Sequence, residues 1–199
     1  MIASSRRAVS AVAICCVAVA TQRAATSAWA SAAAADGTRY TLSPVGVSRA
    51  PSGPPSDAAA RPSSSGSPLT VEDCRWWPRY GDQSLCAVGP GAEGSFVRLR
   101  LAYPLLLVAL WTAVLSLLLQ VIRVPASATR QAVLPAAVCV CTLLAIVFLR
   151  RAPDALTALR GLSFDFGTVG FWLAVAAAGL SAVSATLLLA KEPRAVPEP

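Results

Sequence analysis

Residues 101–122 read LAYPLLLVALWTAVLSLLLQVI, a run without a single charged side chain. Residues 132–149 (AVLPAAVCVCTLLAIVFL) and 169–190 (VGFWLAVAAAGLSAVSATLLLA) are uncharged as well. An α-helix needs about 20 apolar residues to cross the roughly 30 Å of hydrocarbon in a bilayer. The sequence therefore predicts three strong transmembrane helices, which form a bundle over residues 101–190. The expected fold class is an all-α membrane protein.

The composition of the whole chain agrees with a membrane protein. Hydrophobic residues make up 55% of the 199 residues and charged residues only 14%, which is too apolar for a soluble domain of this length. The formal net charge of +7 would fit nucleic-acid binding, but the basic residues are dispersed or flank the apolar runs, without a recognition motif. We therefore expect membrane lipid as a partner, and neither nucleic acid nor a small-molecule substrate.

The residue types that are missing exclude several chemistries. The chain has no histidine, so it lacks a Ser-His-Asp triad, a histidine-ligated zinc site and an imidazole acid or base. The three strong spans contain no Asp, Glu, Lys or Arg, the usual marks of proton relays and of charged-substrate transport. We predict no catalytic residues, no metal site and no cofactor.

Residues 1–30 form a further apolar segment that has two interpretations. Arg6 and Arg7 precede an uncharged run, and the segment ends in Ala28-Trp29-Ala30, which is typical of a signal peptide cleaved after Ala30. The same residues form a weak first transmembrane span if Arg23 extends toward the membrane surface. Both interpretations place the following residues outside, and both remain open at this point.

A long region separates this segment from the first strong span. Residues 31–68 are rich in Ser, Pro and Ala, and they predict a disordered external spacer because they bury too little surface to offset the entropy of ordering. Serine- and proline-rich spacers of this kind are also candidates for O-glycosylation. Residues 69–100 contain aromatic side chains and two cysteines, and they predict an external loop. Residues 191–199 are predicted to be a cytoplasmic tail.

Cys74 and Cys86 delimit the sequence CRWWPRYGDQSLC within the external loop. Oxidation is favoured outside the cell, and a metal site would lack further ligands, so we predict a disulfide that closes this loop. The side chains between the cysteines favour the headgroup region of a membrane, as anchors or as a contact face. The predicted membrane-interface or contact residues are Trp76, Trp77, Tyr80, Arg75 and Arg79.

Small side chains recur at every fourth position of the last span. Small residues at this spacing let helix backbones approach closely in lipid. We predict that the row packs against a neighbouring helix of the same chain, with self-association as the alternative. A second row, Ala177, Ser181 and Ala185, lies beside it. The predicted packing row is Gly170, Ala174, Ala178, Ala182 and Thr186.

The order of these segments resembles the tetraspan plan of claudin-like proteins, and in detail it is similar to the amastins, surface proteins of trypanosomatid parasites. The stretches 95–106 (SFVRLRLAYPLL) and 163–175 (SFDFGTVGFWLAV) resemble the amastin lead-ins to the second and last spans. The amastin cysteines are more closely spaced than those of this chain. The resemblance implies a surface tetraspan protein without known catalysis. The first-loop signature of amastins, Cys, Trp, Gly and Cys, has its counterparts in Cys74, Trp77, Gly81 and Cys86.

We predict a non-enzymatic, multi-pass protein of the plasma membrane that acts through its external loop on lipid, on a second copy or on another membrane protein. The arginines beside the spans are balanced between the two sides, so the predicted cytoplasmic C-terminus rests on the export-like N-terminus. One alternative is a subunit or assembly factor of a larger membrane complex. The other is a lipid-acting membrane enzyme, which is disfavoured because only dispersed Asp and Glu side chains outside the spans could act as acid or base; conservation of Asp154 and Asp165 would favour it.

Overall fold

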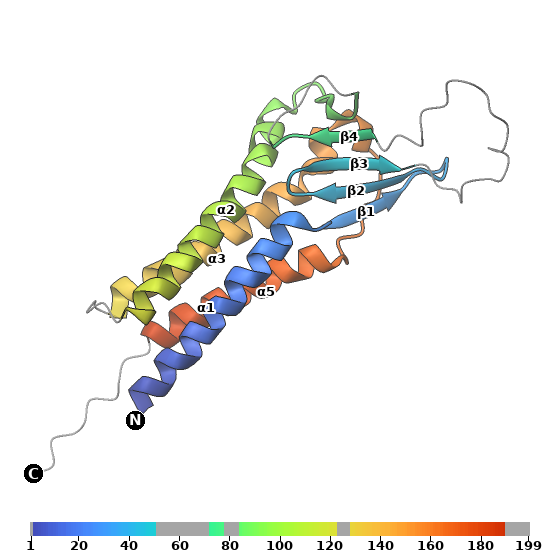
Figure 1. Cartoon of the computed structure of the whole chain (residues 1–199). Coiled ribbons are helices and arrows are strands. Elements are labelled where there is room, and N and C mark those ends of the chain that lie inside the picture. Colours follow the sequence, from blue (N-terminus) through green and yellow to red (C-terminus); the bar gives the residue numbers. More distant parts are fainter. Residues whose placement is uncertain (1, 51–71, 78–83, 123–127, 190–199) are drawn as a thin grey trace, which may run out of the picture. The chain divides into compact units, whose positions relative to one another are not determined.

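The computed structural model describes residues 2–50, 72–77, 84–122 and 128–189, with four long helices among them. Each helix contains a stretch that is long and apolar enough to cross a membrane (Figure 1). The three predicted strong spans are confirmed as helices, and the N-terminal segment supplies a fourth candidate span. The helices are α1 (Ile2–Thr26), α2 (Glu93–Val121), α3 (Ala128–Arg150) and α5 (Val169–Leu189).

Helix α2 begins earlier than the sequence predicted. Residues 93–100, which we assigned to the external loop, are helical. The carboxylate of Glu93 in the first turn interacts favourably with the positive end of the helix dipole. Phe96 and Leu99, three residues apart and both buried, give the first turns of α2 an apolar face. Helix α2 therefore extends N-terminally beyond the predicted span 101–122.

The chain divides into two compact units. The bundle unit comprises Met1–Arg23, Pro104–Leu144 and Leu173–Pro199, and the sheet unit comprises Ala24–Tyr103 and Ala145–Trp172. Each of the long helices contributes residues to both units.

The core of the bundle unit is lined mainly by small and branched apolar side chains from all four long helices. Small side chains allow close approach of helix backbones in an apolar environment. Two hydroxyl groups add a polar link inside the unit, where Ser10 Oγ of α1 and Ser184 Oγ of α5 lie 2.7 Å apart. Helix α1 is thus packed into the core as fully as the other three helices. The core residues are Ile14, Val17, Ala20, Ala109, Ala113, Val138 and Ala177.

The predicted packing row of α5 is buried only in its N-terminal half. Gly170, Ala174 and Ala178 are buried, whereas Ala182 and Thr186 are exposed. Each step of four residues advances about 40° around a helix of 3.6 residues per turn, so the row turns away from its neighbours. The prediction is therefore wrong at the C-terminal end of the row. The buried positions there are supplied by the second row, Ala177, Ser181 and Ala185.

We expect Ala178→Leu to destabilise the bundle unit by about 1–3 kcal/mol, because a larger side chain overpacks a closely packed site. The melting temperature of the full chain in detergent measures this loss. Ala176→Leu makes the same change at an exposed position of α5 and is the matched control, expected to melt like the unaltered protein. A larger loss for Ala176→Leu than for Ala178→Leu would contradict the assigned packing face.

The sheet unit contains four antiparallel strands in the order β1-β2-β3-β4. The mostly helical structure fits the predicted all-α membrane class, with this small sheet as an addition that the sequence did not predict. Residues 31–50 are not a disordered spacer as predicted, because three of the four strands fall largely within them. Residues 51–68 of the predicted spacer and the tail 191–199 lie outside the described residues. The strands are β1 (Ala30–Ala33), β2 (Arg39–Ser43), β3 (Gly46–Ala50) and β4 (Glu72–Arg75).

Turn residues explain why this polar segment folds into hairpins. Asp36 and Gly37 form the turn between β1 and β2, with Gly37 at a φ of 83°, a conformation that glycine adopts without steric cost. The backbone N–H of Thr38 donates to Asp36 Oδ1 at 2.9 Å, which favours the ionised carboxylate and lowers the pKa of Asp36. Tyr40 and Leu42, alternate residues of β2, are buried.

Candidate functional site in the sheet unit

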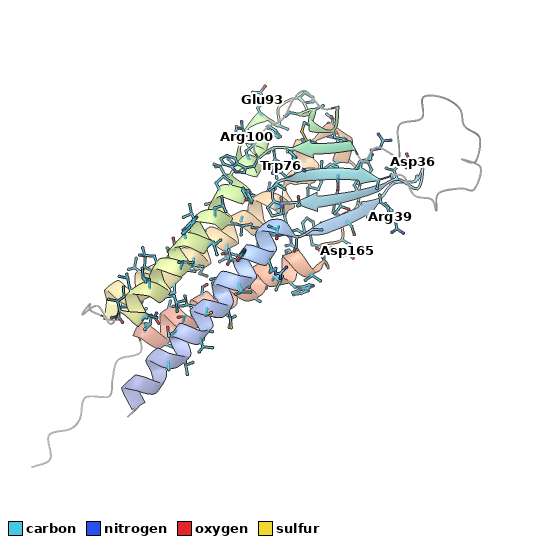
Figure 2. The ribbon with its side chains drawn as sticks, in the orientation of Figure 1. Asp36, Arg39, Trp76, Glu93, Arg100 and Asp165 are labelled. Carbon is cyan, nitrogen blue, oxygen red and sulfur yellow. A yellow bond between two sulfur atoms is a disulfide. The ribbon has the colours of Figure 1, made fainter. Side chains whose placement is uncertain are left out.

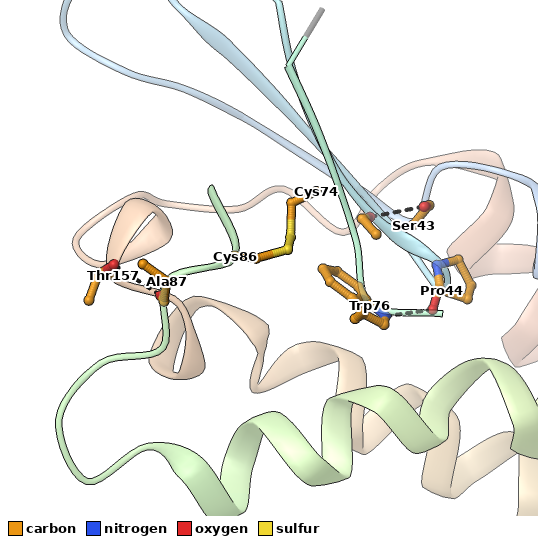
Figure 3. Close-up of a disulfide and its surroundings, with 8 residues drawn as sticks. Ser43, Pro44, Cys74, Trp76, Cys86, Ala87 and Thr157 are labelled. Atoms are coloured by element: carbon orange, nitrogen blue, oxygen red, sulfur yellow. Dashed lines mark hydrogen bonds between the residues drawn. A yellow bond between two sulfur atoms is a disulfide. The ribbon is translucent and has the colours of Figure 1, made fainter. Parts of the chain in front are cut away.

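The predicted disulfide between Cys74 and Cys86 is confirmed (Figure 3). Cys74 lies in β4, and Cys86 ends the short 3₁₀-helix η2 (Ser84–Cys86). Their Cα atoms are 5.5 Å apart, the usual separation across a disulfide. Both cysteines are buried, so the bond is an internal fastener of the sheet unit.

We expect the double variant Cys74→Ala, Cys86→Ala to lose about 3 kcal/mol of stability, because the bond no longer restricts the unfolded chain. Melting in detergent with and without a reducing agent measures the effect. Reductant should lower the melting temperature of the unaltered protein and leave that of the double variant unchanged. Cys139→Ala removes one of the free thiols and is the control, expected to keep the response to reductant. If reductant leaves the melting temperature of the unaltered protein unchanged, the disulfide does not have a stabilising role.

The segment after Cys86 is bonded to the loop between α3 and α5. The backbone N–H and the side-chain hydroxyl of Thr157 both donate to the Ala87 carbonyl oxygen, each at 3.0 Å (Figure 3). Gly89 N–H donates to the Ala155 carbonyl oxygen at 3.2 Å. These bonds hold the disulfide region against two short elements, α4 (Ala152–Ala155) and η3 (Thr157–Leu159).

The same loop also joins the first strand of the sheet. Ser31 N–H donates to the Asp165 carbonyl oxygen at 3.0 Å, and Asp165 N–H donates back to the Ser31 carbonyl oxygen at 2.8 Å. Figure 2 shows Asp165 beside β1, with Asp36 and Arg39 at the far end of the β1–β2 hairpin. The residues between α3 and α5 therefore bond both to β1 and to the segment after Cys86. The region that precedes α2 and the loop between α3 and α5 therefore belong to the same sheet unit.

Trp76 does not lie at a membrane interface, and this prediction is wrong. Its side chain is 0% exposed, and its indole Nε1–H donates to the Pro44 carbonyl oxygen at 2.7 Å (Figure 3). A buried indole needs such a partner, because an unpaired buried N–H costs free energy. Trp76 is thus a core residue of the sheet unit.

The other predicted contact residues have different outcomes. Trp77 is half-buried, with its ring 6.4 Å from that of Tyr103 in α2. Arg75 is exposed, so its side chain is accessible to a partner. Arg79 and Tyr80 lie outside the described residues.

Trp29 is a second buried tryptophan, which sequence analysis treated only as part of a cleavage site. Its side chain is 0% exposed, and Nε1–H donates to the Ala24 carbonyl oxygen at 2.6 Å. Ala24 is in the last turn of α1, where carbonyl groups have no partner within the helix, so the indole caps α1. The ring also packs edge-to-face on Phe171, with centroids 6.4 Å apart.

Gly170 provides the space that Trp29 occupies. A Cβ at Gly170 would lie 2.8 Å from Trp29 Cδ1 and would also collide with the Ala28 carbonyl oxygen. Thr168 Oγ1–H donates to that same carbonyl oxygen at 2.8 Å. The start of α5 is therefore fitted to the segment between α1 and β1, and the burial of Gly170 belongs to this contact.

An arginine and two phenylalanines form a further cluster that sequence analysis missed. The guanidinium carbon of Arg150 lies 5.5 Å from the ring centroids of both Phe166 and Phe171. The two rings are 5.8 Å apart in an edge-to-face arrangement. Trp172 adjoins the cluster, with its ring 5.7 Å from that of Phe171, and is 59% exposed.

The described ranges were compared with the requirements of a metal site, and the chain with known proteins. No group of three His, Cys, Asp or Glu residues in the described ranges could hold a metal ion. A scan against protein-family models and searches of curated proteins and of solved structures found no match.

Proposed function

We propose that the protein is a non-enzymatic, multi-pass protein of the cell surface, whose sheet unit lies outside and binds partner molecules. The supporting observation is that residues 30–50, 72–77, 84–100 and 150–168 fold together around one disulfide, bonded at Ser31 and at Ala87. The sequence predicts the residues before the span 101–122 to be outside, and the two crossings at 101–122 and 132–149 return residues 150–168 to that same side. A stable disulfide is typical of the outer, oxidising side.

Charged side chains of both signs are exposed on this unit. Arg39 and Asp36 lie at the far end of the hairpin (Figure 2), and Arg75 and Arg160 are exposed elsewhere on the unit. Mixed charges favour recognition of a complementary protein surface, because opposite charges fix orientation and like charges reject wrong partners. We propose another membrane protein, or a second copy of the chain, as the partner of this surface.

We also propose that the chain is amastin-like, with the claudin-like tetraspan plan. The four candidate spans, the long first loop and the disulfide agree with that plan. The motifs that resemble amastins also occupy structurally important positions. Trp77 of the first motif packs on Tyr103 of the second, and Gly170 and Phe171 of the third pack on Trp29.

The proposal predicts which sites a protease reaches in intact cells. We expect cleavage at an epitope inserted between residues 51 and 68, and an intact tag at the C-terminus. Permeabilised cells are the control, because both tags should then be cleaved. Cleavage of the C-terminal tag in intact cells would contradict the proposed orientation, and free thiols at Cys74 and Cys86 in surface protein would contradict an oxidising location.

A further inference from the structure

Arg150 lies where two candidate membrane spans end. The span of α3 extends over Gln131–Arg150, and the span of α5 begins at Val169, two residues before Phe171. Because Arg150 stacks on Phe171, the end of α3 and the start of α5 are adjacent within the sheet unit. Ends of spans lie near the lipid headgroups, so Arg150 is placed at that level.

The stacking orients the guanidinium without using its hydrogen-bond donors. The rings of Phe166 and Phe171 attract the cation through their faces, at 5.5 Å each. In an arginine stacked in this way, the N–H groups at the edge of the guanidinium plane stay available as donors. Two of them can donate parallel hydrogen bonds to two oxygen atoms of one phosphate. Arg150 is exposed, so an anion can reach that edge.

The positive charge of Arg150 is not balanced by an ion pair within the described ranges. Asp165 precedes Phe166, but its Oδ1 accepts the Gly167 N–H at 2.9 Å. Arg151 follows directly and is also exposed. Two adjacent, exposed arginines favour a negatively charged ligand.

Trp172 indicates which anion this is. Trp172 is 59% exposed, next to Phe171, at the start of an apolar span. An exposed tryptophan at that depth prefers the boundary between headgroups and hydrocarbon, a position that a dissolved phosphate ion does not require. The observations therefore favour a lipid over a free ion.

We propose that Arg150, Arg151 and Trp172 form a binding site for the phosphate of an anionic phospholipid, with Phe166 and Phe171 orienting Arg150. This site rests on the part of the proposed function in which the helices span a membrane. It does not depend on which side of the membrane the sheet unit occupies.

The test uses the unaltered full chain in lipid nanodiscs of phosphatidylcholine, with or without phosphatidylglycerol. An arginine-modifying dicarbonyl reagent is added, and the modification rate of each arginine is read by peptide mass spectrometry. At an anionic lipid level about ten times the Kd, we expect modification of Arg150 to slow about tenfold. Arg39, at the far end of the hairpin, is the internal control and should react equally in both discs.

Each further outcome has a defined meaning. Equal rates at Arg150 in the two discs would overturn the site, and equal protection by inorganic phosphate in phosphatidylcholine discs would assign it to a free ion instead. Phe166→Leu should reduce the protection, whereas Phe164→Leu, a matched change outside the cluster, should retain it. A chain that fails to insert into either disc would contradict the spanning helices, and thus the proposed function as well as the site.

Discussion

Replacing Trp76 with alanine is expected to destabilise the sheet unit by about 3–5 kcal/mol, the usual cost of removing a buried tryptophan. The indole is 0% exposed, and its Nε1–H is bonded to the Pro44 carbonyl oxygen in the β2–β3 connection. The substitution therefore leaves a cavity and an unpaired carbonyl group. Trp76 also lies two residues after Cys74, so the substitution should also disturb the packing around the disulfide.

The melting temperature in detergent and the amount of protein at the cell surface measure this loss. Trp111→Ala is the matched control, because Trp111 is 69% exposed on α2 and should contribute little to packing within the chain. The melting temperature of Trp76→Phe should lie between those of Trp76→Ala and Trp111→Ala, because phenylalanine fills much of the volume of the indole but cannot form its hydrogen bond. If the Trp76→Ala and Trp111→Ala variants have the same melting temperature, Trp76 is not the core residue that its burial indicates.

The transmembrane helices and the disulfide were predictable because their signals are local in the sequence. An uncharged run of spanning length specifies a helix, and two cysteines in one short external loop have few other partners. The β1–β2 hairpin also had a local signal, the Asp36-Gly37 turn. We missed it because the strands beside it are short and rich in small and polar residues, and the composition of 31–68 dominated the prediction.

The tryptophans and the arginine cluster were not predictable for a different reason. A tryptophan has an apolar body and a polar N–H, and this combination suits both a membrane interface and a hydrogen-bonded core site. The deciding partner of Trp76, Pro44, is 32 residues away. Likewise, Arg150 meets Phe166 and Phe171 only after the chain turns from α3 to α5. Contacts between distant segments decide these roles, and no local pattern reports them.

The mature protein is expected to retain residues 1–30, with α1 as an uncleaved transmembrane helix. Cleavage after Ala30 would separate Trp29 from the sheet unit, although its backbone N–H donates to the Leu42 carbonyl oxygen at 2.8 Å and its ring packs on Phe171. It would also interrupt β1, which begins at Ala30. In the bundle unit, it would remove Ile14 and Val17 from the core.

The loss of stability expected on cleavage after Ala30 exceeds that of any single substitution, because the whole of helix α1 is removed from the core. Mass spectrometry of protein from the cell surface should therefore detect peptides that contain Trp29. A chain that begins at Ser31 behind an unrelated cleavable signal peptide should fail to accumulate, whereas the full chain behind the same signal peptide is the control and should accumulate. Surface protein that begins at Ser31 would show that α1 is only an export signal. The sheet unit would then have to keep its fold without the indole that caps α1 and fills the space beside Gly170.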